Sequence, residues 1–211
     1  MPDASRSQLG ATSRRRLTTD MVRGALLGVG VLAGLMVVLQ VVNWLSASWL
    51  TQHLGIRPRT WDGLWGVLFA PVLHGSWTHL FSNLLLVVVL GFLVALDGAR
   101  RFAAVTAVIW LVSGLGVWLT APPHSVTIGA SMLVFGWLTY LVVRGFMTRD
   151  VWQIVLGVVL IVTLGGMFWT GIAVAAFGSS AVSWQGHLFG AAGGVLAAVQ
   201  VGRAGRGRTT A

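Results

Sequence analysis

Six long apolar stretches, separated by short polar connections, dominate the hydropathy pattern of this 211-residue chain. A helix needs about 20 mostly apolar residues to cross the hydrocarbon core of a bilayer, and each stretch approaches or reaches this length. The pattern therefore predicts an all-α membrane protein whose six transmembrane helices form one domain, residues 24–201. The predicted helices span residues 24–45, 74–96, 101–119, 127–144, 151–169 and 183–201.

Composition supports this interpretation, because 56% of the residues are hydrophobic and only 9% are charged. These values lie far outside the range of ordinary soluble domains. The two ends of the chain, residues 1–23 and 202–211, are polar and rich in Arg, Ser, Thr and Gly. They contain too few apolar side chains to build a core, so we predict disordered tails on either side of the membrane domain.

The positive charge of the chain is distributed unevenly around the predicted helices. The formal net charge is +9, and all 14 basic residues are arginines. Only Arg57 and Arg59 lie on one side, whereas the other twelve lie in the two tails and the connections after the second and fourth helices. Cytoplasmic segments carry the excess of arginine, so both termini are predicted to be cytoplasmic. The arginines are interpreted as topology signals, and no nucleic-acid partner is expected.

The first external connection, residues 46–73, is the longest and contains Trp49, Trp61 and Trp65 among apolar residues. Tryptophan is enriched where hydrocarbon meets water. This pattern predicts a loop that lies in the outer membrane interface. A plain connection with an aromatic belt remains the alternative.

Four polar residues are predicted to share one depth near the outer side of the membrane. Ser131 and His187 each lie about four residues into their predicted helices, which places both roughly 6 Å below the helix start. His79 and Asn83 are four residues apart and share a face of the second helix. A serine nucleophile needs a base and donors for the oxyanion. His187 is the candidate base, and the donors are His79, Asn83 and the Ser131 N–H. Alternatively, Ser131 merely allows close helix packing.

A ridge of small residues follows the candidate base on the last helix. His187, Gly190 and Gly194 lie on one face, and such a ridge lets a neighbouring helix approach closely. If that neighbour is the fourth helix, the ridge brings His187 to Ser131. Phe135, one turn after Ser131, is then expected to pack against the imidazole, with ordinary core packing as the alternative.

Other chemistries fit the composition poorly. The chain has no cysteine and no glutamate, which excludes thiol catalysis and a zinc protease of the H-E-x-x-H type. His74 and His79 are five residues apart, so a continuous helix would splay them. The aspartates fall in tails, loops or helix ends, which excludes an aspartyl protease and a carboxylate third member of a triad. We expect neither metal nor cofactor, and a Ser–His dyad.

These residues resemble the rhomboid family of intramembrane serine proteases. His74, His79 and Asn83 match its H-x-x-x-x-H-x-x-x-N pattern, and Gly129 and Ser131 match its G-x-S-G motif. The third match is the H-x-x-G-x-x-x-G run of His187, Gly190 and Gly194. The resemblance implies a six-helix bundle with a water-filled cavity that opens to the outer side. It further implies that residues 170–182 form part of a gate and cap.

The resemblance also implies a function: endopeptidase cleavage of transmembrane segments that contain small, helix-weakening residues, in a lipid bilayer. One residue departs from the family pattern, because Met132 replaces the glycine after the nucleophile. This change is expected to narrow the substrate pocket or shift the Ser131 N–H. An alternative function is therefore a proteolytically silent relative that binds transmembrane segments as an adaptor or chaperone. The minimal chain suggests a bacterial plasma membrane, and nothing in the sequence indicates an oligomeric state.

Overall fold

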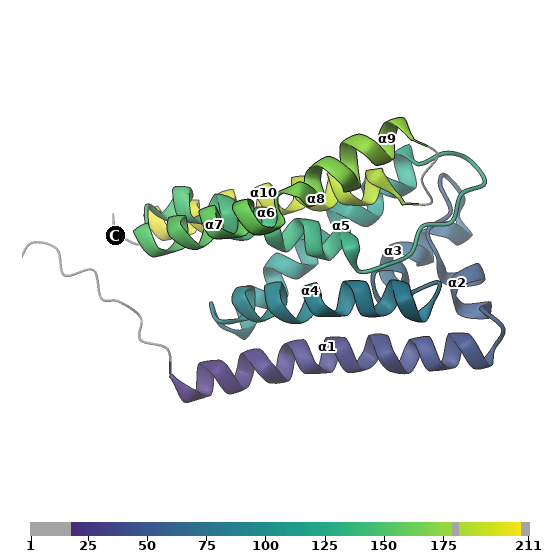
Figure 1. The fold of residues 1–211 in the computed structure, drawn as a ribbon, viewed down its shortest axis with the longest axis horizontal. Helices are drawn as coiled ribbons and strands as arrows, with labels where there is room; N and C mark the ends of the chain where they lie inside the picture. The colour runs from purple at the N-terminus through teal and green to yellow at the C-terminus, as the bar shows by residue number, and fades with distance from the viewer. Residues whose placement is uncertain (1–17, 179–181, 208–211) are drawn as a thin grey trace, which may run out of the picture.

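The computed structural model describes residues 18–178 and 182–207, which are nearly all helical (Figure 1). Four helices are long and apolar enough to cross a membrane, and a bent pair of helices makes a fifth candidate if it counts as one span. The four are α1 (Thr19–Leu45), α4 (Trp77–Ala95), α5 (Ala99–Thr120) and α6 (Ser131–Thr148). The described part of the chain thus has the character of a multi-pass membrane protein.

The predicted fifth helix is broken rather than continuous. It consists of α7 (Val151–Leu164) and a second half, Gly166–Phe177, and the two halves are inclined by 52°. The second half contains α8 (Gly166–Phe168), the π-helical turn η3 (Trp169–Val174) and α9 (Ala175–Phe177). The last helix, α10 (Trp184–Gly207), is as long as the others but begins with polar residues and glycines, which lower its hydropathy.

Helix α6 lies at the centre of the bundle, because it contacts α4, α5, α7 and α10 and is the most buried of the four candidate spans. Helix α10 packs against α5 and α6, while α1 packs on α4 (Figure 1). The close contact between α6 and α10 follows the predicted glycine ridge. A Cβ atom on Gly190 would lie 2.2 Å from the Met132 carbonyl oxygen, and one on Gly194 would lie 2.2 Å from that of Gly136. The two backbones therefore touch directly.

The first and last helices extend into the residues that were predicted to be tails. The Thr18 side chain accepts a hydrogen bond from the Met21 N–H, so α1 begins at Thr19 and includes residues predicted as tail. Helix α10 continues to Gly207, past the predicted end at residue 201. The rest of the predicted tails, residues 1–17 and 208–211, lies outside the described residues.

The external connection between α1 and α4 folds into short helices: α2 (Trp49–Leu54), η1 (Asp62–Leu64), α3 (Trp65–Phe69) and η2 (Ala70–Val72). Its Arg59 N–H donates to the Trp118 carbonyl at 3.0 Å, and the Trp118 indole donates to the Thr60 carbonyl at 2.9 Å. The Arg59 guanidinium also donates to carbonyls at the end of α5. The connection is therefore fixed to the bundle, although its tryptophans Trp49, Trp61 and Trp65 remain exposed.

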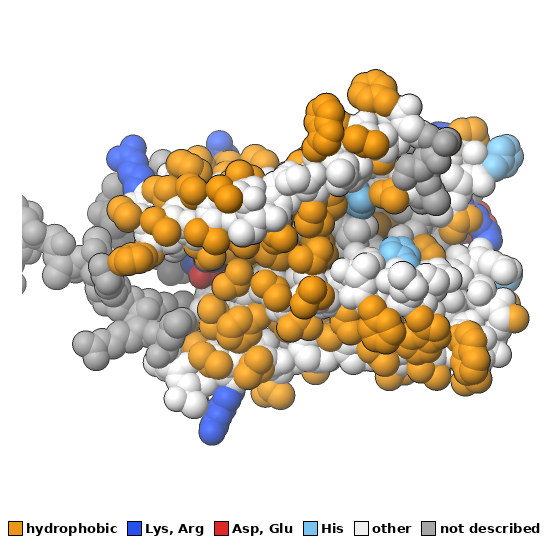
Figure 2. All heavy atoms as spheres, in the orientation of Figure 1, with side chains coloured by type: hydrophobic (Ala, Val, Ile, Leu, Met, Phe, Trp, Pro, Cys, Tyr) orange, Lys and Arg blue, Asp and Glu red, His pale blue; other side chains and the backbone are white. Residues whose placement is uncertain are grey.

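The opposite end of the bundle contains a buried ion pair. Arg144 of α6 pairs with Asp97, and the Tyr140 hydroxyl donates to the same carboxylate at 3.1 Å. Apolar side chains cover the flanks of the helices in the face that Figure 2 shows, and a hollow between the helices contains histidine side chains. This hollow lies toward the end of the bundle at which α4 begins.

Candidate active site

The segment before α6 determines where Ser131 lies. Thr127 pairs with Ile56 through two backbone hydrogen bonds of 3.0 Å, and the Gly129 N–H donates to the Ala70 carbonyl at 2.8 Å. Gly129 has a φ of +119°, a conformation that side chains disfavour. This extended segment delays the start of the helix, so Ser131 is the first residue of α6. The expected depth of four residues was wrong.

A serine and a histidine from different helices meet in a hydrogen bond. The Ser183 side chain accepts from the Gly186 N–H, which starts α10 at Trp184 and puts His187 in its first turn. The His187 Nε2 atom lies 2.9 Å from the Ser131 Oγ atom. The sequence predicted this pair, although the two residues are separated by 56 positions.

The other ring nitrogen of His187 contacts a backbone group. Its Nδ1 atom lies 2.7 Å from the Gly171 carbonyl oxygen in η3. A carbonyl only accepts hydrogen bonds, so the proton of a neutral ring resides on Nδ1. Nε2 is then left as the acceptor for the serine hydroxyl. Sequence reasoning missed Gly171, because a backbone carbonyl leaves no side-chain signal.

Phe135 holds the plane of the imidazole. Its ring stacks on His187 with centroids 4.1 Å apart and planes inclined by 4°. Phe135 also contacts Phe168 of α8, whose ring meets it edge-on with ring centroids 5.4 Å apart. The structure thus shows the contact that the sequence predicted, with Phe168 as a further support.

His74 lies outside the helix that was predicted to contain it. Ser76 caps α4, so the helix begins at Trp77 and His74 precedes it. The His74 and His79 rings meet edge-on with centroids 5.0 Å apart, so the expected splay was wrong. The Ala130 N–H donates to His74 Nε2 at 3.4 Å. Burial lowers the pKa of His74 to about 4, which keeps this nitrogen free to accept.

The second-helix candidates occupy different positions relative to Ser131. His79 lines the same cavity as Ser131, whereas Asn83 is buried and donates its Nδ2–H to the His79 carbonyl at 2.8 Å. Gly129 lies against the His79 ring, because a Cβ atom at this position would be 2.8 Å from its Nε2 atom. His79 therefore forms part of the cavity wall with Gly129 packed against its ring, whereas Asn83 contacts the His79 backbone and does not line the cavity.

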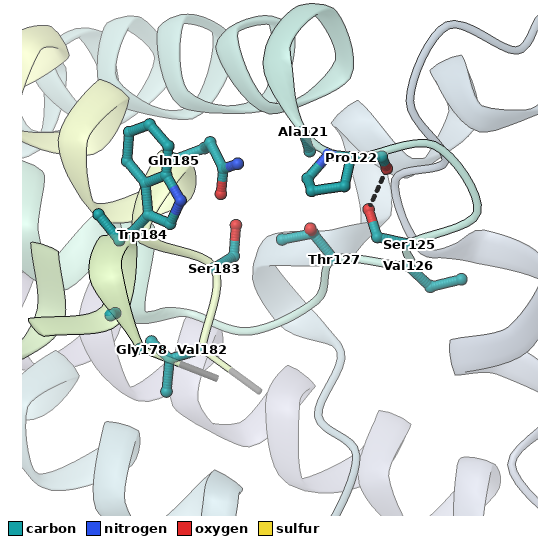
Figure 3. A pocket seen from close by; sticks show the side chains of 12 residues that line it. Ala121, Pro122, Ser125, Val126, Thr127, Gly178, Val182, Ser183, Trp184 and Gln185 are labelled. Carbon is teal, nitrogen blue, oxygen red and sulfur yellow. Dashed lines mark hydrogen bonds between the residues drawn. The ribbon is translucent and has the colours of Figure 1, made fainter. Parts of the chain in front are cut away.

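The Ser131 hydroxyl faces a cavity of about 250 Å³. A neighbouring cavity of about 350 Å³ is lined by residues that include Thr127, Ser183 and Gln185, whose side chains face one hollow in Figure 3. Thr127 and Ser183 line both cavities. The volumes suffice for several water molecules, each of which occupies about 30 Å³ in the liquid. No three metal-ligating side chains come together within residues 18–178 and 182–207.

Comparisons with known proteins show to which family this chain belongs. The sequence matches the Rhomboid domain over residues 62–204. The chain belongs to the rhomboid family. The matched range contains every candidate site residue and most of the bundle, so the resemblance inferred from the motifs is confirmed. This family comprises intramembrane proteases that act on transmembrane substrates.

Relatives extend the match toward the N-terminus. An uncharacterized protein of Mycobacterium tuberculosis is 44% identical over 188 residues, which are 86% of this chain and 78% of the relative. An uncharacterized protein of Mycobacterium leprae is 39% identical over 86% of this chain and 74% of its own. A Bacillus subtilis protein named "Putative rhomboid protease YdcA" is 30% identical over 75% of this chain and 82% of its own.

Met132, the departure from the rhomboid motif, is part of both the core and the cavity wall. Its side chain is 1% exposed and lines the cavity beside Ser131. Its carbonyl is the group that the glycine ridge contacts at Gly190. The side chain therefore occupies space beside the serine, and the backbone of the same residue is in contact with α10.

Proposed function

We propose that this rhomboid is an intramembrane serine endopeptidase with Ser131 as nucleophile and His187 as general base. The observation that carries this proposal is the 2.9 Å hydrogen bond between His187 Nε2 and Ser131 Oγ. The distance lies within the range needed for proton transfer. The Nδ1 contact with Gly171 leaves Nε2 unprotonated and aimed at the hydroxyl.

In the acylation step, Nε2 takes the hydroxyl proton while Oγ attacks the carbonyl carbon of the scissile peptide bond. The tetrahedral intermediate then collapses, and His187 passes the proton to the leaving amine. Water from the cavity attacks the resulting ester in the same way, which releases the second product and restores Ser131. His187 carries the proton in both halves of the reaction.

The start of α6 suits the developing oxyanion. As the first helical residue, Ser131 has an N–H group without an intrahelical acceptor, and the positive end of the helix dipole lies beside it. His79 lines the same cavity and is the proposed side-chain donor. Asn83 remains a proposed supporting residue, which acts through the His79 carbonyl that it holds.

We further propose six membrane spans: α1, α4, α5, α6, the bent α7–α9 unit and α10. The catalytic side faces outward, and the termini lie in the cytoplasm of a bacterial cell, with the connection of Trp49, Trp61 and Trp65 in the outer interface. Support comes from the common end at which α4, α6 and α10 begin, opposite the buried Arg144 pair (Figure 1). The chain contains no cysteine, so single introduced cysteines report sidedness without background labelling.

The decisive experiment is covalent labelling with a fluorophosphonate serine probe. Wild-type protein in detergent should be labelled, and the Ser131→Ala and His187→Ala variants should not. Ser113→Ala is the matched control, because Ser113 is a buried serine whose hydroxyl donates within α5. Cleavage of a model transmembrane substrate in vesicles should show the same dependence on Ser131 and His187.

The alternative function, a silent binder of transmembrane segments, is tested by the same experiment. A folded wild type that resists labelling would support the binding role. If Met132→Gly then gained labelling, the side chain that lines the cavity would be the cause of silence. Labelling of the wild type at Ser131 would refute the alternative.

A further inference from the structure

The contact between His187 and Gly171 joins the catalytic helix to a helix of unusual geometry. Gly171 lies in η3, the π-helical turn within the bent α7–α9 unit. π turns are rare, and they occur frequently at functional sites. In this turn the Gly171 carbonyl oxygen lies 2.7 Å from His187 Nδ1. The irregular backbone is thus in direct contact with the dyad.

Only glycine allows this approach. A Cβ atom at position 171 would lie 2.5 Å from Phe135 Cζ and 2.9 Å from His187 Nδ1. Both distances are shorter than a carbon atom tolerates, and both neighbours are rings held against each other by stacking. Any side chain at this position would therefore push η3 away and break the hydrogen bond.

No carboxylate takes the place of this carbonyl in the described part of the chain. Each aspartate described there serves another part of the structure: Asp20 lies in the first turn of α1, Asp62 pairs with Arg57, Asp97 pairs with Arg144, and Asp150 caps α7. Within the described residues, the two ring nitrogens of His187 contact Ser131 and Gly171. The backbone carbonyl is the acceptor available to fix the tautomer.

We propose that the Gly171 carbonyl is the positioning group of the dyad, which holds His187 as the Nδ1–H tautomer and makes serine activation depend on the placement of η3. A neutral imidazole that carries its proton on Nε2 cannot accept the serine proton, so the wrong tautomer is inactive. This inference rests on the proposed function of the dyad. A displacement of the bent α7–α9 unit would break the hydrogen bond between the Gly171 carbonyl and His187 Nδ1. The tautomer of His187 would then no longer be fixed, even with α6 and α10 unmoved.

The test weakens the carbonyl without changing a side chain. Replacement of Ile172 by its α-hydroxy analogue converts the Gly171 amide to an ester, whose carbonyl is a weaker acceptor. The same replacement at Val162 is the matched control, because it weakens the Ile161 carbonyl, which accepts from the Gly165 N–H in α7. Labelling should be about tenfold slower in the Ile172 variant, because the weakening of one hydrogen bond changes a rate by about this factor. The Val162 control should be labelled at the wild-type rate.

A second pair of variants tests the approach of η3. Gly171→Ala should lose labelling, whereas Gly166→Ala in the same bent unit should keep it, because nothing lies within 4 Å of a Cβ atom at position 166. Thermal unfolding of both variants shows whether the bundle is intact. A folded Gly171→Ala protein that is labelled at the wild-type rate would overturn the proposal.

Nitrogen NMR of ¹⁵N-histidine protein separates this inference from the proposed function. The His187 signals are assigned by their absence in His187→Gln. We expect a protonated Nδ1 and an unprotonated Nε2 in the wild type, and a mixture of tautomers in the Ile172 ester variant. An unprotonated Nδ1 in the wild type would refute the inference. Failure of wild-type labelling with a protonated Nδ1 would instead refute the protease activity and leave the hydrogen bond standing.

Discussion

Replacement of Gly190 by alanine tests whether the contact of α6 and α10 brings the dyad together. The added Cβ atom would lie 2.2 Å from the Met132 carbonyl oxygen, one residue from Ser131. Relief of this overlap requires the two helices to separate by about 1 Å, because both atoms belong to backbone or are fixed to it. The Ser131–His187 hydrogen bond of 2.9 Å cannot survive such a separation.

The expected loss is large because the chemistry depends on position. A misplacement of about 1 Å costs roughly 100-fold in rate, and overpacking costs about 1–3 kcal/mol of stability. Gly186→Ala is the control for helix packing one turn earlier, since its Cβ atom would meet other atoms at 3.5 Å or more. Gly34→Ala in α1 is the control for labelling, since nothing lies within 4 Å of a Cβ atom there. The labelling rate and the thermal unfolding midpoint should both fall in Gly190→Ala, whereas the midpoint should be unchanged in Gly186→Ala and the labelling rate unchanged in Gly34→Ala. Wild-type labelling and stability in Gly190→Ala would refute the close-contact argument.

Three further predictions concern the surroundings of the dyad. Gly129→Ala should reduce labelling at least about tenfold, because the residue has a φ of +119° and its Cβ atom would lie 2.8 Å from the His79 ring; unchanged labelling would exclude this wall from the site. Burial lowers the pKa of His74 to about 4 from the ordinary 6.5. The unfolded chain therefore binds a proton that the folded chain does not, and stability should fall by up to about 3 kcal/mol as the pH drops from about 6.5 to about 4. Unfolding midpoints of His74→Gln should depend less on pH over that window, and an equal slope would refute the assignment. Arg144→Leu should cost about 3 kcal/mol by removing one partner of the buried pair with Asp97, and the double variant with Asp97→Asn should lose less in thermal unfolding.

The sequence predicted the membrane character and the identity of the family. Apolar stretches of about 20 residues have few alternatives to a spanning helix, because unpaired backbone groups are costly in lipid. The motifs around Ser131 and His187 predicted the family, which the Rhomboid domain match confirms. The glycine ridge also predicted the close contact between α6 and α10, since the sequence shows directly where a helix has no side chain to keep its neighbour away.

Helix limits and local geometry were predicted less well. Ser131 lies at the first residue of α6 because Thr127 and Gly129 are held in an extended segment by partners on the external connection. His74 meets His79 because the cap at Ser76 starts α4 after it. Both outcomes depend on hydrogen bonds that apolar periodicity does not report.

The sequence by itself determined that this chain is a rhomboid of the membrane and which side chains are available for chemistry. Only the tertiary structure decided how the His187 ring is oriented, because the group that contacts its Nδ1 atom is the carbonyl of Gly171. Every residue has such a carbonyl, and its identity carries no side-chain signal. Its position depends on the π turn, on the 52° bend within the α7–α9 unit and on the contact of η3 with α10, none of which a single residue type specifies.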